Sequence, residues 1–236
     1  MNKSIWIWPH LGLGDQISCC AIIRHYAKRY ENVYVFVKDH NLENTRYMFR
    51  DLDNVKFISG KGGEDEFVHF YIWTHPEINL LKLGHENLNR YPELNFDQVF
   101  YKVAGIPFEK KFEDFYVKRD EKIENEVCAI LNPMNIPYVF IHQDTTRGFT
   151  MNMDYIKDKD LKIIESNFKF DGSKDYLVFH YMKLIEEAQE VHVMESAFKC
   201  MIDGYIKQKD NMFFHKYMRE GVSAVGRAYW NIINKR

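Results

Sequence analysis

Residues 4–28 read SIWIWPHLGLGDQISCCAIIRHYAK. The stretch opens with a short, bulky apolar run of the kind that is buried on both faces in a parallel sheet. A turn with two glycines follows, and Ile17, Ala21 and Ile22 then recur at helical spacing. Because another apolar run follows at residues 33–37, the stretch predicts a βαβ unit at the start of an α/β protein.

A second strand-to-helix junction lies near the other end of the chain. Residues 190–194 (EVHVM) form an apolar run, and residues 195–206 continue with helical spacing. A glycine-rich or hydroxyl-bearing turn that opens a helix presents unpaired backbone N–H groups and the positive end of the helix dipole to an anion. Two such junctions predict a nucleotide-type ligand bound between two halves of the chain.

The remaining pattern predicts strands that alternate with helices in both halves. The other expected strands cover residues 55–58, 66–73, 138–141, 161–164, 191–194 and 212–215. The other expected helices cover residues 41–50, 97–104, 121–131, 196–206 and 222–233, with one more that starts at Ser173 or Asp175. This order implies two Rossmann-like, doubly wound α/β domains that face a cleft. We place the boundary within residues 117–125, which gives domains of residues 1–120 and 121–236.

The composition fits a globular protein with one large or two small domains. Of the 236 residues, 46% are hydrophobic and 16% are aromatic, which is enough to fill real cores. The 32 basic and 34 acidic side chains leave a net charge of -2, so no global basic surface points to nucleic acid. There is no apolar run of about 20 residues, and the first apolar run is too short for a signal peptide, so we expect a soluble, cytoplasmic protein.

The cysteines indicate neither disulfide bonds nor a metal site. Cys19, Cys20, Cys128 and Cys200 show no CxxC spacing and no Cys/His cluster, and adjacent cysteines rarely bond to each other. This usage favours a reducing compartment and no structural zinc.

The turn of the first junction holds the first candidate site residues. Gly12 and Gly14 begin a dinucleotide-binding fingerprint, but Ile17 stands where the third glycine belongs. Asp39 lies near the position of a ribose-binding acid. Alternatively, the two glycines only permit a tight turn. Asp15 lies in the first turn of the expected helix, where the dipole stabilises its carboxylate, and it is either a general base facing a cleft or a capping acid.

A second group of candidates follows the strand at residues 138–141. The turn that begins there reads HQDTTRGF and gathers His142, Asp144 and Arg147 beside two threonines. Loops at the carboxyl ends of parallel strands bind ligands. An arginine beside hydroxyls and free N–H groups suits a diphosphate. The alternative is a solvated loop with a surface ion pair.

The third group is the helix start at residues 195–198 (ESAF). Ser196 either caps this helix or binds a phosphate. Glu195 would repel a phosphate, so we expect it to accept hydrogen bonds from the sugar end of the ligand. His192 and His215 lie in or beside apolar strands, and we expect both to be core residues with satisfied hydrogen bonds.

Taken together, these motifs resemble those of the two-domain GT-B glycosyltransferases. The Gly14-Asp15 turn is similar to the Gly-Asp turn of heptosyltransferases, whose Asp is the base that activates the acceptor. The second half is similar to GT-B fucosyltransferases, whose His-x-Arg loop and Ser-Ser helix start hold the donor nucleotide and diphosphate. Here Arg147 stands three residues beyond the family's Arg position, which is Asp144, and Ala197 replaces the second Ser. Small enzymes of this kind resemble those of large viruses and some bacteria.

The resemblance implies a transferase that moves a monosaccharide from a nucleoside diphosphate sugar to a hydroxyl acceptor on a glycan. It implies inversion and no metal or cofactor beyond the donor, with a GDP-sugar favoured and a UDP-sugar as the other option. Its implied site residues are Asp15 as catalytic base and, for the ligand, Gly12, Gly14, His142, Asp144, Arg147, Glu195, Ser196 and Ala197.

Two other classes of function stay open at this point. One is a dinucleotide-dependent oxidoreductase that uses Gly12, Gly14 and Asp39, against which the missing third glycine counts. The other is a nucleotide-binding or glycan-binding module without turnover. The sequence leaves the oligomeric state open.

Overall fold

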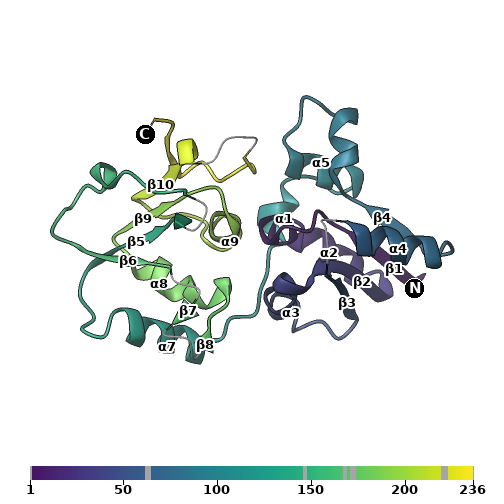
Figure 1. Cartoon of the computed structure of the whole chain (residues 1–236), viewed down its shortest axis with the longest axis horizontal. Helices are drawn as coiled ribbons and strands as arrows, with labels where there is room; N and C mark the ends of the chain where they lie inside the picture. Colours follow the sequence, from purple (N-terminus) through teal and green to yellow (C-terminus); the bar gives the residue numbers. More distant parts are fainter. Residues whose placement is uncertain are drawn as a thin grey trace. The chain divides into compact units, whose positions relative to one another are not determined.

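The computed structural model describes residues 2–61, 65–145, 148–166, 169–170, 174–218 and 223–235. The chain divides into two compact units, Met1–Lys118 and Arg119–Arg236. Each unit has its own main sheet, and every described strand pairing within these two sheets is parallel (Figure 1). The predicted α/β class with parallel sheets is therefore confirmed.

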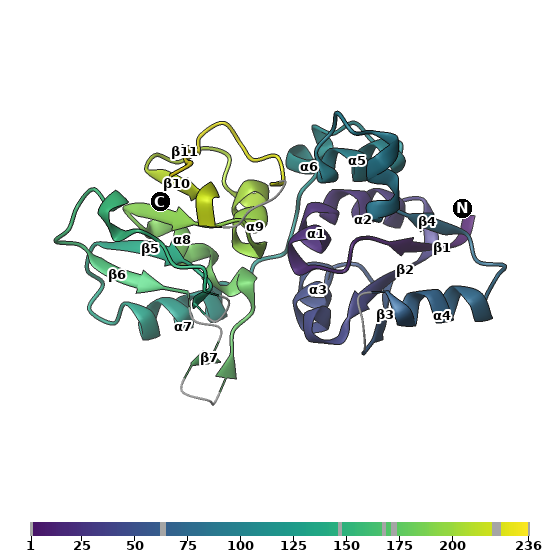
Figure 2. The same ribbon diagram turned by 45° about the horizontal axis from the view of Figure 1, so that its top comes forward.

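The first unit is built on a four-stranded sheet in the order β3-β2-β1-β4. Its strands are β1 (Asn2–Trp8), β2 (Tyr30–Lys38), β3 (Val55–Gly60) and β4 (Leu80–Lys82). Its helical elements are α1 (Leu13–Ser18), α2 (Cys20–Ala27), η1 (Asp39–Asn41), α3 (Leu42–Met48), α4 (Glu66–Thr74), η2 (His85–Arg90), α5 (Phe96–Val103) and α6 (Lys110–Glu113). In Figure 2, α2 and α5 lie on one side of this sheet and α4 on the other. Both faces of β1 and β2 are thus buried, which explains their continuous apolar runs.

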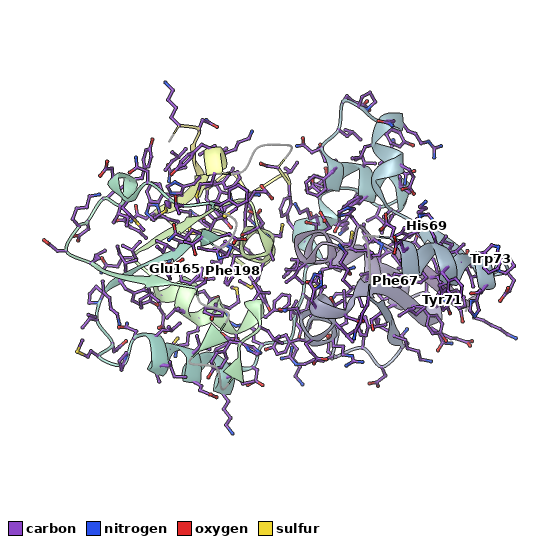
Figure 3. All side chains as sticks on the ribbon, viewed as in Figure 1. Phe67, His69, Tyr71, Trp73, Glu165 and Phe198 are labelled. Atoms are coloured by element: carbon purple, nitrogen blue, oxygen red, sulfur yellow. The ribbon has the colours of Figure 1, made fainter. Side chains whose placement is uncertain are left out.

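One prediction in this unit is wrong, because residues 66–73 form helix α4 and not a strand. Val68 packs with Trp8 and Phe36 on the sheet, and Tyr71, about one helical turn further on, packs against the same cluster. Trp73 points away from the sheet (Figure 3) and is 77% exposed. The aromatic residues favour a strand by composition, but their burial follows a helical period. The fourth strand is β4.

The second unit is built on a five-stranded sheet in the order β11-β10-β9-β5-β6. Its strands are β5 (Tyr138–His142), β6 (Lys162–Glu165), β9 (Glu190–Val193), β10 (Met212–His215) and β11 (Asn231–Ile233), and a separate pair joins β7 (Lys169–Phe170) to β8 (Lys174–Asp175). Its helical elements are α7 (Glu121–Leu131), η4 (Met153–Tyr155), η5 (Val178–Tyr181), α8 (Met182–Glu187), α9 (Ala197–Tyr205) and η6 (Lys216–Met218). Helix α7 covers the predicted residues because Asp120 caps it by accepting a hydrogen bond from the Ile123 backbone N–H.

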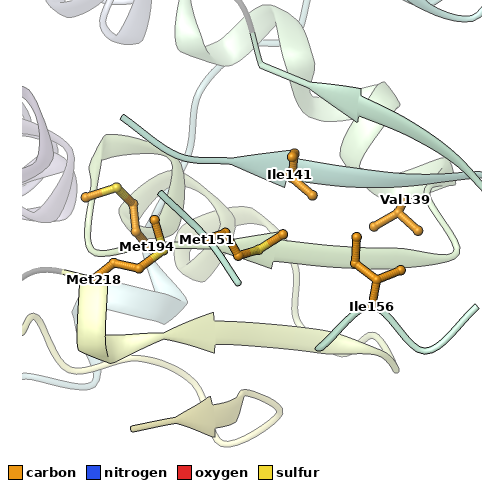
Figure 4. Close-up of a cluster of buried hydrophobic side chains, with 6 residues drawn as sticks. All are labelled: Val139, Ile141, Met151, Ile156, Met194 and Met218. Carbon is orange, nitrogen blue, oxygen red and sulfur yellow. The ribbon is translucent and has the colours of Figure 1, made fainter. Parts of the chain in front are cut away.

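The two faces of this sheet are covered differently. On one face, the Tyr138 hydroxyl donates to the Leu184 carbonyl of α8, and the Phe140 ring packs on Phe198 of α9. On the other face, Val139 and Ile141 pack under residues 149–161, which we call the cover segment (Figure 4). Within the cover segment, the one helical turn is η4. Irregular chain therefore stands where a doubly wound domain usually places a helix.

Two further predictions in this unit are wrong. The helix expected at residues 222–233 is absent from the described residues 223–233, where irregular chain leads into β11. The Asp203 carboxylate accepts hydrogen bonds from Trp230 Nε1 at 2.7 Å and from the Arg227 backbone N–H at 3.1 Å. These bonds hold residues 227–230 in an irregular loop that leads into β11. The helix expected to start at Ser173 or Asp175 starts later, since Asp175 ends β8 and Ser173 lies outside the described residues.

Candidate functional site

A carboxylate and an imidazole pair at the carboxyl end of β1. His10 Nδ1 lies 2.6 Å from Asp15 Oδ2, and each side chain is 19% exposed. Asp15 stands in the first turn of α1, after the N-cap residue Gly12. The pair therefore combines a helix-stabilised carboxylate with a partner that fixes its orientation, while leaving both side chains partly open to solvent.

Gly12 makes room for this carboxylate. A Cβ atom at position 12 would lie 2.6 Å from Asp15 Oδ2, and the Gly12 φ of -66° is one that any residue adopts. The glycine is therefore needed for space and not for backbone freedom. Gly14 is part of the first turn of α1.

The turn between β1 and α1 is tied to the end of β2. Asn41 Nδ2 donates to the Leu11 carbonyl at 3.0 Å, and Gln16 Nε2 donates to the Phe36 carbonyl at 2.9 Å. All four residues are buried. A turn held on both sides by buried hydrogen bonds keeps the Asp15 carboxylate in one place, as a catalytic group requires.

Basic side chains flank the end of β1. Lys82 of β4 places its Nζ 4.3 Å from the Trp8 ring centroid, and His69 of α4 meets the same ring edge-on at 5.0 Å. Asp39, the ribose-binding candidate of the oxidoreductase alternative, lies in η1 directly after β2. The carboxyl edge of this sheet is thus a polar surface built by four elements.

In the second unit, His142 ends β5 and is buried. Its Nδ1 lies 2.6 Å from the hydroxyl oxygen of Ser166, just beyond β6, and its ring packs on Phe198 with centroids 4.3 Å apart. Asp144 pairs with Phe149 through two backbone hydrogen bonds that close the 142–148 turn. Arg147 lies outside the described residues.

Ser196 does not cap helix α9 with its side chain. Its hydroxyl donates to the Met194 carbonyl at 3.1 Å and, within the described chain, bonds to no N–H group of the helix. Ala197 is the first residue of α9 and adds no polar side chain. The capping alternative for the Ser196 hydroxyl is therefore wrong, and the phosphate-binding role stays a prediction.

Glu195 occupies an unusual place for a carboxylate. Its Oε2 atom is buried without a hydrogen-bond partner among the described residues, and Lys199 Nζ lies 4.0 Å away. Burial raises the pKa of Glu195, and the charge on Lys199 only partly opposes this. Hydrogen bonds from Ser223 and from the Ala224 backbone also oppose the shift, so the carboxylate belongs to a buried polar cluster of the second unit.

The predicted site residues thus fall into two groups at the carboxyl edges of the two sheets. The first unit contributes Gly12, Gly14 and Asp15, and the second contributes His142, Asp144, Glu195, Ser196 and Ala197. Sequence reasoning missed His10, although it precedes Asp15 by only five residues in the same turn. It also missed Ser166, which meets His142 only through the pairing of β5 with β6.

Within the described ranges, no three His, Cys, Asp or Glu side chains gather as a metal site would need. In the same part of the chain, no helix combines the length and the apolarity that a membrane crossing demands. All four cysteines are free thiols.

No protein family model matches the sequence, and no curated protein is significantly similar to it. A solved structure of a glycosyl transferase family 9 protein from Veillonella parvula DSM 2008 is similar over 90% of this chain and 80% of that chain, with 9% identity and a TM-score of 0.54. The E. coli ADP-heptose LPS heptosyltransferase II matches over 83% of this chain and 65% of that chain, with 14% identity and a TM-score of 0.32. The first likeness shows a shared fold, whereas the second score is too low to support a conclusion.

Proposed function

We propose that the chain is a GT-B-like glycosyltransferase. It moves a monosaccharide from a nucleoside diphosphate sugar, with GDP-sugars favoured over UDP-sugars, to a hydroxyl acceptor on a glycan. The observation that carries the proposal is the His10–Asp15 pair at 2.6 Å, which supplies an oriented base at the carboxyl end of β1. The shared fold with the family 9 protein supports it.

In the proposed reaction, Asp15 takes the proton of the acceptor hydroxyl. The acceptor oxygen forms a bond to the anomeric carbon as the bond from that carbon to the diphosphate oxygen breaks, so the configuration inverts. The Nδ1–H group of His10 donates to Asp15 Oδ2 and holds the carboxylate toward the acceptor. Donor and acceptor are the only reactants, and no metal takes part.

The second unit holds the donor in this proposal. Ser196 and the first N–H groups of α9 bind the diphosphate, and Arg147 stabilises the charge that develops on it as it leaves. Glu195 accepts hydrogen bonds from sugar hydroxyls. His142 is fixed by Ser166 and orients the nucleotide.

The geometry of the first turn disfavours the oxidoreductase alternative. A dinucleotide places its pyrophosphate against the glycine-rich turn and the start of the first helix. Here the Asp15 carboxylate fills the space beside Gly12, since a Cβ at that glycine would collide with it. An anion in that position repels a pyrophosphate.

A nucleotide panel tests the proposal against both alternatives. We expect GDP, and UDP more weakly, to raise the melting temperature of the protein, whereas NAD, ADP and CMP leave it unchanged. A ligand at 100 times its Kd stabilises the folded state by about 2.7 kcal/mol. Stabilisation by NAD alone would contradict the proposal. Binding of a nucleoside diphosphate without turnover of any sugar donor would identify a binding module.

A further inference from the structure

Two histidines lie fully buried on the sheet face beneath the cover segment. His192 of β9 stands beside Ile141 of β5 on one side and Phe213 of β10 on the other. His215, at the end of β10, is buried as completely. The proposed reaction uses neither histidine.

These histidines form the middle of a chain of hydrogen bonds. Glu190 Oε2 lies 3.2 Å from His192 Nε2, and His192 Nδ1 lies 2.9 Å from His215 Nε2. His215 Nδ1 lies 3.1 Å from the hydroxyl oxygen of Tyr217 in η6. Glu190, His192, His215 and Tyr217, which we call the relay, are thus linked without a gap.

With both imidazoles neutral, one arrangement of protons satisfies every bond of the relay. The Tyr217 hydroxyl donates to His215 Nδ1, His215 Nε2–H donates to His192 Nδ1, and His192 Nε2–H donates to the ionised Glu190. Burial alone would raise the pKa of Glu190, but hydrogen bonds from two backbone N–H groups and from His192 lower it. Reversing the order would turn the lone pair of His192 Nε2 toward this carboxylate. Both imidazoles are neutral in this arrangement, which agrees with the burial that lowers the pKa of each ring.

Both ends of the relay bind backbone groups of the cover segment. The Tyr217 hydroxyl oxygen accepts from the Asn152 N–H at 2.9 Å. The Glu190 carboxylate accepts from the Lys157 and Asp158 N–H groups, each at 3.1 Å. Because irregular chain cannot satisfy its N–H groups as a helix does, these side chains supply acceptors for three partly buried backbone N–H groups.

The cover segment is in turn tied to the 142–148 turn. Asp144 and Phe149 exchange two backbone hydrogen bonds of 3.0 and 2.9 Å. The Gln143 side-chain oxygen accepts from the Met151 N–H at 2.8 Å. Movement of the cover segment would therefore be transmitted to the turn.

We propose that the relay is a positioning device that fastens the cover segment to the sheet, holds Gln143 and Asp144 at the start of the 142–148 turn in place, and loosens in acid. The role of that turn in donor binding rests on the proposed function. The attachment of the cover segment to the sheet by the relay does not depend on the proposed function. Relay residues act here through the cover segment and touch no reacting atom.

The acid response follows from the neutral histidines. Burial lowers the pKa of His192, with Glu190 opposing and Lys157 and Lys159 of the cover segment reinforcing the shift. Burial and His192 lower the pKa of His215 to about 3. The other ionisable groups facing His215 are Tyr155 and Tyr217.

An open form of the segment lets these histidines protonate near their ordinary pKa of about 6.5, so it binds more protons than the closed form. Opening is thus favoured as the pH falls below about 6.5. Between pH 7.5 and 5.5, exposure of His215, whose pKa is about 3 in the closed form, raises the opening equilibrium about tenfold.

The first test is hydrogen–deuterium exchange at pH 7.5 with a matched pair of tyrosine variants. Tyr217→Phe removes the acceptor of the Asn152 N–H and keeps the ring, so exchange of that amide should rise at least tenfold while β5 and β9 stay protected. Tyr155→Phe is the control. It also removes the hydroxyl of a ring that packs against His215, but that hydroxyl bonds to the Lys235 carbonyl, outside the relay. If the Asn152 amide exchanged at the same rate in the wild type and in Tyr217→Phe, the proposal that the relay fastens the cover segment would be overturned.

A second pair of variants tests the histidines. Glutamine can accept from Tyr217 and donate to His192, so His215→Gln should keep the wild-type exchange at pH 7.5, whereas His215→Phe should not. Exchange rates are corrected for intrinsic exchange at each pH. The factor by which the opening equilibrium rises between pH 7.5 and 5.5 should then be about ten times smaller in His215→Gln than in the wild type. The same pH response in both proteins would overturn the acid response.

Calorimetry with GDP tests the link to the donor. Tyr217→Phe should weaken GDP binding at least fivefold, and Tyr155→Phe should leave it unchanged. If Tyr217→Phe raised the exchange rate but left the GDP affinity unchanged, the proposed effect of the relay on the 142–148 turn would be overturned. Wild-type protein that binds neither GDP nor UDP would overturn the proposed function and the donor role of the turn, while the exchange rates would still decide the fastening.

Discussion

Replacing Asp15 with Asn should lower sugar transfer by roughly 10²–10⁴-fold, the usual contribution of general acid–base catalysis. Asn keeps the size of the side chain and is an equally good residue at a helix start, but it cannot take a proton from the acceptor. Affinity for the donor should stay the same, because the proposed donor groups are in the other unit. Transfer and donor affinity are best measured on the same preparation.

The matched control for Asp15 is Asp39→Asn. Asp39 is also an acid that follows a strand of the first sheet, but the proposed mechanism gives it no part, so this variant should transfer sugar at the wild-type rate. Full activity of Asp15→Asn would refute the base assignment. Loss of donor affinity in Asp15→Asn would instead place the nucleotide on the first turn.

Replacing Asp203 with Ala should destabilise the second unit by about 3–5 kcal/mol, the cost of breaking a buried ion pair by removing one partner. Lys199 Nζ lies 3.0 Å from Asp203 Oδ2, and the two side chains are 1% and 0% exposed. Burial alone would lower the pKa of Lys199, but Asp203 and Glu195 raise it, so the lysine stays charged. The variant would also deprive the Trp230 N–H group of its acceptor.

Urea denaturation followed by circular dichroism measures this loss. The control is Glu113→Ala, which breaks an ion pair of 2.8 Å with Lys110 at the surface of the first unit. Exposed pairs contribute about 0.2–1 kcal/mol, so this variant should unfold close to the wild type. A loss of stability as small as this in Asp203→Ala would contradict the prediction, because it would mean that Lys199 is not left as an unpaired buried charge.

Seven of the nine strands in the two main sheets, all except the short edge strands β4 and β11, could be predicted from local sequence, as could the edges at which their loops gather. Buried parallel strands such as β1 and β5 need continuous apolar runs, which are visible without a structure. Helix α5 could be predicted because a glycine, Gly105, stands just past its end. In the structure Gly105 adopts a φ of +67°, as a glycine at the end of a helix often does. Helix α4 could not be predicted, because its aromatic residues favour a strand and only their contacts with Trp8 and Phe36 show the helical period.

The candidate site was predictable only where its residues are close in sequence. Asp15 follows from its place at a helix start, and Glu195 from its place after an apolar strand. The partners of these residues depend on pairing between distant segments. Ser166 meets His142 across 24 residues of sequence, and His192 meets His215 across 23. Such contacts follow from strand register, which local patterns do not determine.

The central claim, transfer of a sugar from a nucleotide, is tested most directly by NMR of the anomeric protons. Wild-type protein is incubated with GDP-sugars and UDP-sugars and with glycan acceptors that carry free hydroxyls. We predict that one donor signal is replaced by that of a glycoside of opposite anomeric configuration, with one nucleoside diphosphate released for each sugar moved. A donor that binds and stays intact with every acceptor would contradict the account.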